Sequence, residues 1–188
     1  PKRDILSELC TKYKVSKLGF DGAHLPYNVF KSWAESLIGI SLVPMNNAVE
    51  EIRRPKEPEE ITAIMDAIAV ATDAFTAILE IVRPGRAEKE IADELDYAMR
   101  KRGAQGPSFE TIVASGPRAA LPHAEPTAKK LEEGETVIID FGAAVGGYCS
   151  DETVTVCLGD IPDTLAEIYT IVNDARKLGI EKARAGTT

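Results

Sequence analysis

Apolar positions recur at helical spacing over three long stretches of the chain. The first stretch begins at Pro58 and carries one apolar stripe: Ile61, Ile64, Met65, Ile68, Phe75, Ile78, Leu79 and Val82. Arg83-Pro84-Gly85 then predicts the end of that helix, because proline and glycine interrupt helical geometry. A second helix is predicted over 88–102 and a third from Pro162 to about Arg184.

Between the second and third helices the pattern changes to short apolar, β-branched runs, which predict strands. One run covers 109–114, and two more, 137–141 and 153–158, flank a small-residue centre at 143–147. The glycines at this centre suit a tight turn, so the last two runs predict a β-hairpin.

The predicted turn also sets which residues face each other. If Val145 and Gly146 are its central residues, Asp140 faces Asp151, with Cβ atoms roughly 4.5–5.5 Å apart. Carboxylates that close repel, so they would share one proton or hold divalent cations between them. A pair of solvated aspartates near a turn is the plainer alternative. Thr153 lies on the same face as Asp151.

Residues 1–48 alternate helical and strand patterns, which predicts a small α/β unit. Helix is expected over 4–13 and after Pro26, and short strands over 17–20 and 40–43. The charged, proline-punctuated segment 46–60 then reads as a domain boundary. We therefore expect two domains, 1–52 and 53–188.

Composition narrows the class of protein. Apolar residues make up 44% of the 188 positions, which supports a globular core, and the net charge of −8 argues against a nucleic-acid partner. No apolar run approaches the roughly 18 residues of a membrane span, so no membrane partner is expected. The cysteines Cys10, Cys149 and Cys157 form no zinc or disulfide framework. Together with a charged N-terminus, this predicts a cytoplasmic protein.

Three further residues are candidates for chemistry. His123 lies in the proline-rich loop before the hairpin, and a lone loop histidine is either an ordinary surface residue or a functional one. Cys149 falls on the same strand face as Asp151, so thiolate ligation is an alternative to an ordinary strand cysteine. His24, in the loop Asp21-Gly22-Ala23-His24, is expected to be a turn residue.

Three segments together resemble the pita-bread metallopeptidases, in particular aminopeptidase P and Xaa-Pro dipeptidase. They are SFETIVASG, then Pro122-His123, then IIDFGAAVGGYCSDETVTV. The family pattern is a Pro-His, an aspartate ending a strand, and a Gly-Tyr-x-Ser-Asp-x-Thr strand. Val154 departs from it, since many members carry arginine there.

The resemblance implies an α+β fold: the first half of a pita-bread catalytic domain, preceded by the end of a small α/β N-terminal domain. It makes Asp140 and Asp151 two of five ligands of a dinuclear metal centre, with Thr153 beside them and His123 contacting the substrate. Manganese or cobalt would be the ions, with zinc as the alternative. The implied reaction is hydrolysis of the N-terminal Xaa-Pro bond of a dipeptide or peptide, and the implied assembly is a homodimer.

The remaining ligands, one histidine and two glutamates, are implied to come from a second half outside these residues. The chain is therefore expected to be a fragment that is inactive alone. Two alternatives stay open: a non-catalytic pita-bread protein that binds peptides or partners, and a metal-free, creatinase-like hydrolase. The presence of both aspartates counts against each of them.

Overall fold

The computed structural model describes residues 2–187, with the side chains of residues 5–187. It divides the chain into two compact units, one ending at Glu57 and the other beginning at Pro58. This division falls slightly beyond the expected boundary at residue 52, because helix α3 (Ala48–Arg53) groups with the N-terminal unit. The assignment of the two parts to named domains stays a prediction.

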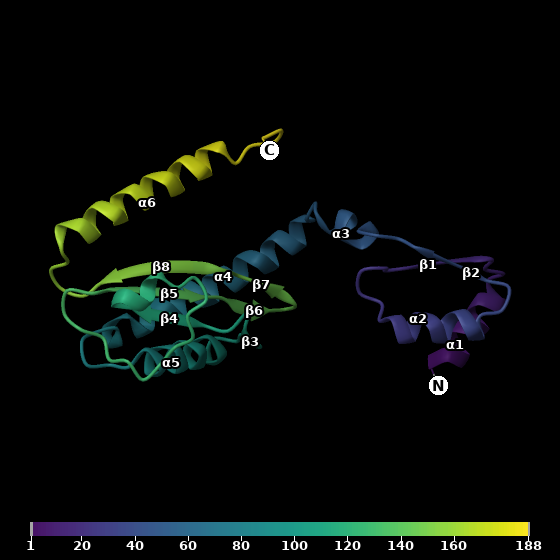
Figure 1. Cartoon of the computed structure of the whole chain (residues 1–188), viewed down its shortest axis with the longest axis horizontal. Helices are drawn as coiled ribbons and strands as arrows, with labels where there is room; N and C mark the ends of the chain where they lie inside the picture. Colours follow the sequence, from purple (N-terminus) through teal and green to yellow (C-terminus); the bar gives the residue numbers. More distant parts are fainter. Residues whose placement is uncertain (1, 188) are drawn as a thin grey trace. The chain divides into compact units, whose positions relative to one another are not determined.

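The N-terminal unit is a small α/β arrangement (Figure 1). Its order is α1 (Lys2–Lys12), β1 (Lys17–Phe20), α2 (Tyr27–Ser36), β2 (Ser41–Pro44) and α3. The two strands run parallel, with Lys17 opposite Ser41. The predicted alternation of helices and strands is confirmed in this part.

Within residues 58–187 the second unit combines three α-helices and two short 3-10 helices, labelled η, with two antiparallel sheets. Its elements are α4 (Pro58–Ile78), η1 (Leu79–Ile81), α5 (Glu88–Lys101), β3 (Gly106–Pro107), β4 (Ile112–Ser115), η2 (Gly116–Ala120), β5 (Thr136–Phe141), β6 (Ala143–Val145), β7 (Tyr148–Cys149), β8 (Glu152–Cys157) and α6 (Asp163–Lys182). One sheet has the order β4-β5-β8 and the other β3-β6-β7. The three predicted long helices and the predicted hairpin are confirmed, whereas β3 was not expected.

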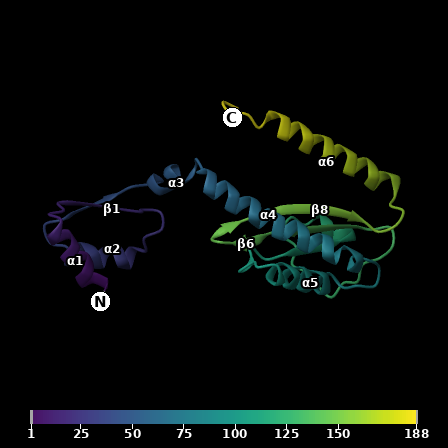
Figure 2. The same cartoon turned by 180° about the vertical axis from the view of Figure 1, so that it is seen from behind.

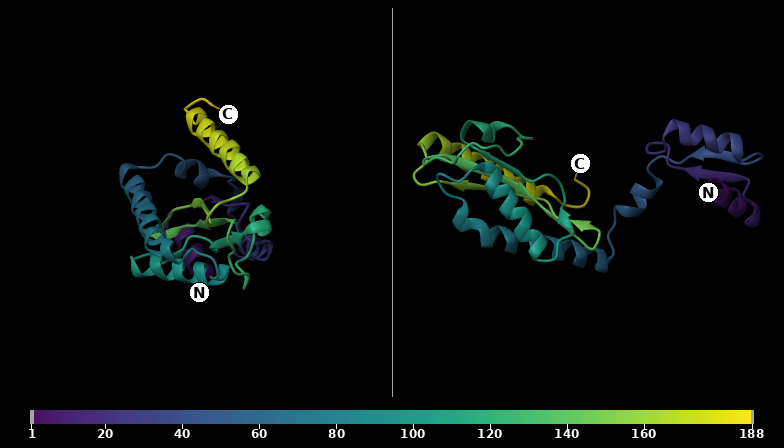
Figure 3. Two further views of the ribbon diagram at one scale, coloured as in Figure 1. Left: turned by 90° about the vertical axis from the view of Figure 1, so that its left-hand side faces the viewer. Right: turned by 90° about the horizontal axis from the view of Figure 1, so that it is seen from below.

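The core lies on one face of the β4-β5-β8 sheet. Val137, Ile139 and Phe141 of β5 are fully buried, and the residues between them are only half-buried. Figures 1 and 2 show α5 along this face of the sheet, and Figure 3 shows α4 beside it. The ring of Phe141 stacks on Phe75 of α4, with 5.3 Å between centroids. Helices therefore cover one face of β5 and leave Asp140 on the other.

Helix α4 with its following turn is long and apolar enough, by length and composition, to cross a membrane. The helix nevertheless carries Asp66 and Asp73 on exposed positions. Its buried residues, Ala67, Ala71, Ala74 and Ile78, follow one helical face. The small alanine side chains let α4 approach α5 and the sheets closely. In this structure α4 therefore packs as a core helix.

The hairpin turn differs by one residue from the expected one. Gly146 and Gly147 are the central residues, with φ of 59° and 86°, and Val145 pairs with Tyr148. A two-residue turn with positive φ at both positions is the one that glycine favours and that fits twisted strands. The expected centre at Val145 and Gly146 was wrong, because it would put a β-branched residue at positive φ.

Candidate metal centre

Asp140 is the residue before the last of β5 and lies in the middle strand of its sheet. It pairs with Ile112 of β4 on one side and with Thr153 of β8 on the other. The side chain is half-buried, and its Oδ1 accepts a hydrogen bond of 2.7 Å from the Thr153 hydroxyl. This contact holds the carboxylate in one orientation on the face of the sheet that the core helices leave open.

Asp151 comes directly before β8 and is exposed. Its neighbour Ser150 is buried and hydrogen-bonded to Ala143 in both directions. The Ser150 N–H donates to the Ala143 carbonyl at 3.0 Å, and the Ala143 N–H donates to Ser150 Oγ at 3.0 Å. Ser108 Oγ also donates to the Ser150 carbonyl at 2.7 Å. The backbone that carries Asp151 is therefore held by three hydrogen bonds.

The expected direct pairing of Asp140 with Asp151 is wrong. Asp140 faces Thr153, and the same register, continued toward the turn, places Gly142 opposite Asp151. Moving the turn by one residue shifts each partner by two positions, so the alternation of faces is kept. For Asp151, which lies just outside β8, this register predicts a diagonal position relative to Asp140 on the same face, with roughly 7–8 Å between backbones.

Two carboxylates on one face, one of them fixed by a threonine hydroxyl, are a donor set that hard divalent cations accept. Carboxylates at a diagonal spacing on one face could both reach an ion placed between them. The residues present therefore fit part of a divalent-metal site. Cys149, the alternative ligand, is exposed on β7 opposite Ala144, and its ligation stays a prediction.

His123 is exposed on the loop between η2 and β5. It lines a hollow of about 410 Å³ whose other walls are the segments 109–112 and 124–126. Ile112, one of the lining residues, is the strand partner of Asp140. The hollow beside His123 therefore reaches the strand position next to the predicted ligand.

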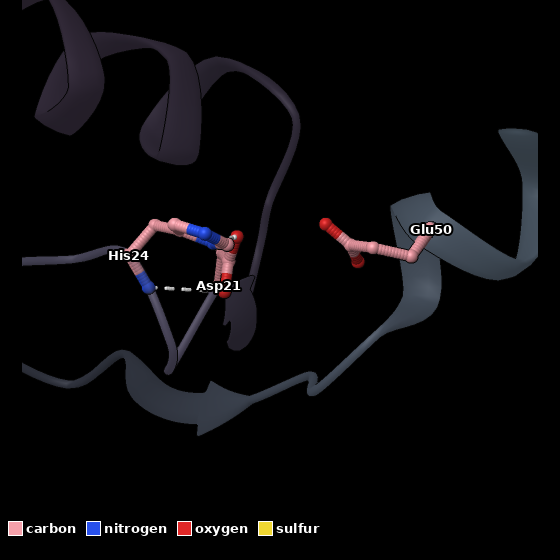
Figure 4. Close-up of side chains that lie close together, drawn as sticks. All are labelled: Asp21, His24 and Glu50. Carbon is pink, nitrogen blue, oxygen red and sulfur yellow. Dashed lines mark hydrogen bonds and ion pairs between the residues drawn. The ribbon is translucent and has the colours of Figure 1, made fainter. Parts of the chain in front are cut away.

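A second group of potential metal ligands lies in the N-terminal unit (Figure 4). One ligand atom from each of Asp21, His24 and Glu50 lies within 4.8 Å of the other two. Asp21 Oδ2 bonds to His24 Nδ1 at 2.7 Å, and Asp21 Oδ1 accepts the N–H of Ala23 at 2.9 Å. These bonds close a turn, which confirms the expectation that His24 is a turn residue.

This turn shifts the pKa values of two of its residues. The hydrogen bond to Asp21 and the charge of that carboxylate raise the pKa of His24 above its ordinary 6.5. The same hydrogen bond lowers the pKa of Asp21 below 3.8. None of the predicted ligands of the hairpin belongs to this group.

Two further acidic residues were not anticipated from the sequence. Asp96 of α5 accepts a hydrogen bond of 2.5 Å from Thr111, and burial raises its pKa above the ordinary 3.8. Glu88, the first residue of α5, is fully buried and accepts hydrogen bonds from Ser115, Arg118 and Thr127. Their partners lie 15 to 39 residues away in the chain, so no local pattern signals either residue.

The chain belongs to a family of known proteins. Residues 62–188 match the family described as Metallopeptidase family M24. The solved peptidases that this chain matches have the pita-bread fold. The mixed helix-and-sheet architecture described above therefore corresponds to about half of that fold.

Three relatives define the likeness more closely. The uncharacterized peptidase YqhT of Bacillus subtilis is 41% identical over 176 residues, which cover 94% of this chain and 50% of the relative. A solved Xaa-Pro dipeptidase from Bacillus anthracis is 40% identical, with a TM-score of 0.89 over 92% of this chain and 48% of the other. An X-Pro aminopeptidase from Thermotoga maritima gives 34%, a TM-score of 0.93, and coverage of 99% and 53%. The chain thus spans about half the length of the relatives it matches.

Proposed function

We propose that the protein hydrolyses the N-terminal Xaa-Pro bond of dipeptides or peptides in a metal-dependent reaction. In this proposal a second half, such as the relatives have, completes the site. The observation that carries it is the Asp140 carboxylate, which Thr153 orients on the sheet face away from α4 and α5. The strand register, continued to Asp151, and the hollow that His123 lines support it. Membership of a metallopeptidase family and the Xaa-Pro names of relatives support the same activity.

Each residue then has a defined task. Asp140 and Asp151 would hold two divalent ions, and Thr153 would keep one Asp140 oxygen occupied so that the other faces the ions. When bound, such ions supply Lewis acidity and lower the pKa of water toward neutrality. Manganese or cobalt, with zinc as the alternative, are the proposed ions.

His123 is proposed to act on the substrate. An imidazole that lines the hollow could donate its N–H to the oxyanion that develops when the peptide carbonyl is attacked. A histidine placed there could also pass a proton to the departing proline nitrogen. The proline of the substrate would follow the bond that is cut.

Metal binding can be tested on this chain directly. Titration with Mn²⁺ should broaden the NMR signals of residues around Asp140 and Asp151, and D151N should abolish that broadening. D160N, an exposed aspartate beyond β8, serves as the control and should behave as wild type. Equal broadening in wild type and D151N would exclude Asp151 as a ligand.

The reaction requires a complete site. We expect the 188-residue chain alone to show no robust hydrolysis of Xaa-Pro dipeptides, since two carboxylates supply too few ligands for two ions. A chimera in which this chain replaces the matching half of the Bacillus anthracis Xaa-Pro dipeptidase should hydrolyse them when metal is added. A folded, metal-loaded chimera without activity would contradict the proposal.

We also propose a cytoplasmic location and a homodimeric assembly. The location is supported by Cys10, Cys149 and Cys157, which are free rather than joined in disulfides. The dimer is proposed from the family resemblance, and sedimentation of the protein would test it.

A further inference from the structure

We propose that the buried carboxylate of Glu88 is a positioning residue for the loop that carries His123. It would act through hydrogen bonds that hold both ends and the middle of segment 115–127 against the start of α5. The catalytic meaning of this positioning rests on the function proposed above, whereas the positioning itself concerns contacts within this chain.

Five hydrogen bonds converge on this one side chain. Oε1 accepts the N–H and the hydroxyl of Ser115, both at 2.9 Å. Oε2 accepts the N–H of Thr127 at 3.1 Å, the Thr127 hydroxyl at 2.7 Å and Arg118 Nε at 3.1 Å. The Glu88 side chain is fully buried, so these donors replace the water that an ionised carboxylate would otherwise need.

The donors lie at defined places along the loop. Ser115 ends β4 and Thr127 follows the last residue of the His123 hollow, so the two oxygens hold opposite ends of the segment. Arg118 lies between them in η2 and also donates through Nη2 to the carbonyl of Glu125 at 2.6 Å. His123 therefore lies within a loop that is fastened on both sides of it.

The surrounding charges favour an ionised Glu88. Arg118 forms an ion pair with it, and Lys129 Nζ donates to the Ser115 hydroxyl that in turn contacts Glu88. Burial alone would raise the pKa of Glu88, but the hydrogen bonds from Thr127 and Ser115 outweigh it and leave the pKa below the ordinary 4.5. A carboxylate that stays charged can hold all five donors at once.

Glu88 is not needed simply to begin the helix. The N–H groups of Glu88 and Lys89 donate to the carbonyls of Lys129 and Thr127 at 3.0 Å, and the N–H of Ala87 donates to Glu90 Oε2 at 3.0 Å. The first turn of α5 thus has backbone and side-chain partners of its own. The Glu88 carboxylate is directed instead toward the loop.

The chain offers a clean readout, because its two histidines, His24 and His123, lie in different units. In E88Q the amide group would present N–H donors where Thr127 or Ser115 also donates, so the loop should detach. We expect shifted and broadened His123 ring signals, and amide exchange over the loop about tenfold faster or more, with the His24 signals unchanged.

Two matched controls separate positioning from general loss of stability. E90Q alters a glutamate in the same helical turn that does not touch the loop, and it should leave His123 unchanged. T127V removes one donor to Glu88 while T127S keeps it, so T127V should reproduce part of the E88Q effect and T127S none of it. The threonine pair keeps the test decisive if E88Q does not fold.

The outcomes distinguish the two proposals. Loop exchange that is unchanged in E88Q and T127V, or that rises equally throughout α5 and β5, would overturn the positioning role whatever the protein catalyses. In the active chimera described above, T127V should lower kcat while metal content stays equal to that of T127S. If the chimera is inactive but the loop is released in this chain, the proposed function fails and the positioning role stands.

Discussion

Thr153 and Asp140 face each other across strands β5 and β8, and the threonine hydroxyl donates to the aspartate Oδ1 at 2.7 Å. This relation replaces the expected facing pair of aspartates. It gives the candidate site one ligand that is already oriented before any ion arrives.

Removing the Thr153 hydroxyl should therefore weaken metal binding. Partners that orient a metal ligand are typically worth 10- to 100-fold in affinity, so T153V should raise the dissociation constant for Mn²⁺ by about tenfold or more. T153S, which keeps the hydroxyl, should bind as wild type does. Calorimetric titration would measure both variants, and equal affinities for T153V and T153S would remove the orienting role.

A side chain at position 142 should disturb the backbone that carries Asp151. A Cβ on Gly142 would collide with the carbonyl oxygen of Ser150 and with Ser108 Oγ. The carbonyl cannot move without breaking the hairpin, so we expect G142A to cost about 2 kcal/mol of unfolding free energy. Urea unfolding would measure this loss.

Gly179 of α6 provides the control for that variant. Nothing lies within 4 Å of a Cβ built there, and the residue is inside a helix. G179A should leave stability unchanged or raise it by up to about 1 kcal/mol, because alanine favours the helix. A G142A protein as stable as G179A would contradict the collision.

The turn at Asp21 makes a prediction about pH. His24 has a raised pKa because Asp21 accepts its hydrogen bond, so D21N should lower that pKa toward 6.5. The contact favours the folded state below the ordinary pKa and is lost as the pH rises through the folded value. An NMR titration of the His24 ring measures the change, with His123 in the same spectrum, and an unaltered His24 pKa would refute the assignment.

Glu88 should make the second unit sensitive to acid. Its pKa is lowered in the folded protein, so its ionised form stabilises the fold above about pH 4.5, and this stabilisation fades as the pH falls through the folded value. At neutral pH, E88Q should cost about 3 kcal/mol, because the Ser115, Thr127 and Arg118 donors lose their charged acceptor in a buried site. Unfolding experiments should show the gap between wild type and E88Q narrowing below pH 4.5. A gap that is constant with pH would mean that Glu88 does not titrate as described.

Much of the fold was predictable because its signals are local. The stripe from Ile61 to Val82 and the β-branched runs around Ile139 follow fixed periods along the chain. The predicted strand register was wrong because the turn was placed one residue too early, although Gly146-Gly147 is the pair of residues that tolerates positive φ. An error of this kind keeps the alternation of faces, so the prediction that Asp140 and Asp151 share one face does not depend on it.

The contacts of Glu88 were beyond prediction for a different reason. They join the first turn of α5 to Ser115 and Thr127, and no periodicity links such distant positions. An acidic residue in the first turn of a helix is ordinary, so its burial becomes visible only when the loop is folded over it.

The alternation along β5 has a consequence for sequence variation. Val137, Ile139 and Phe141 are buried beneath α4 and α5, whereas Ile138 and Asp140 lie on the other face and are only half-buried. In a library of all single substitutions over β5, the effect on folding should therefore depend on whether the residue number is odd or even. Odd-numbered substitutions would deplete soluble protein, and even-numbered ones would spare expression while altering whatever the open side receives.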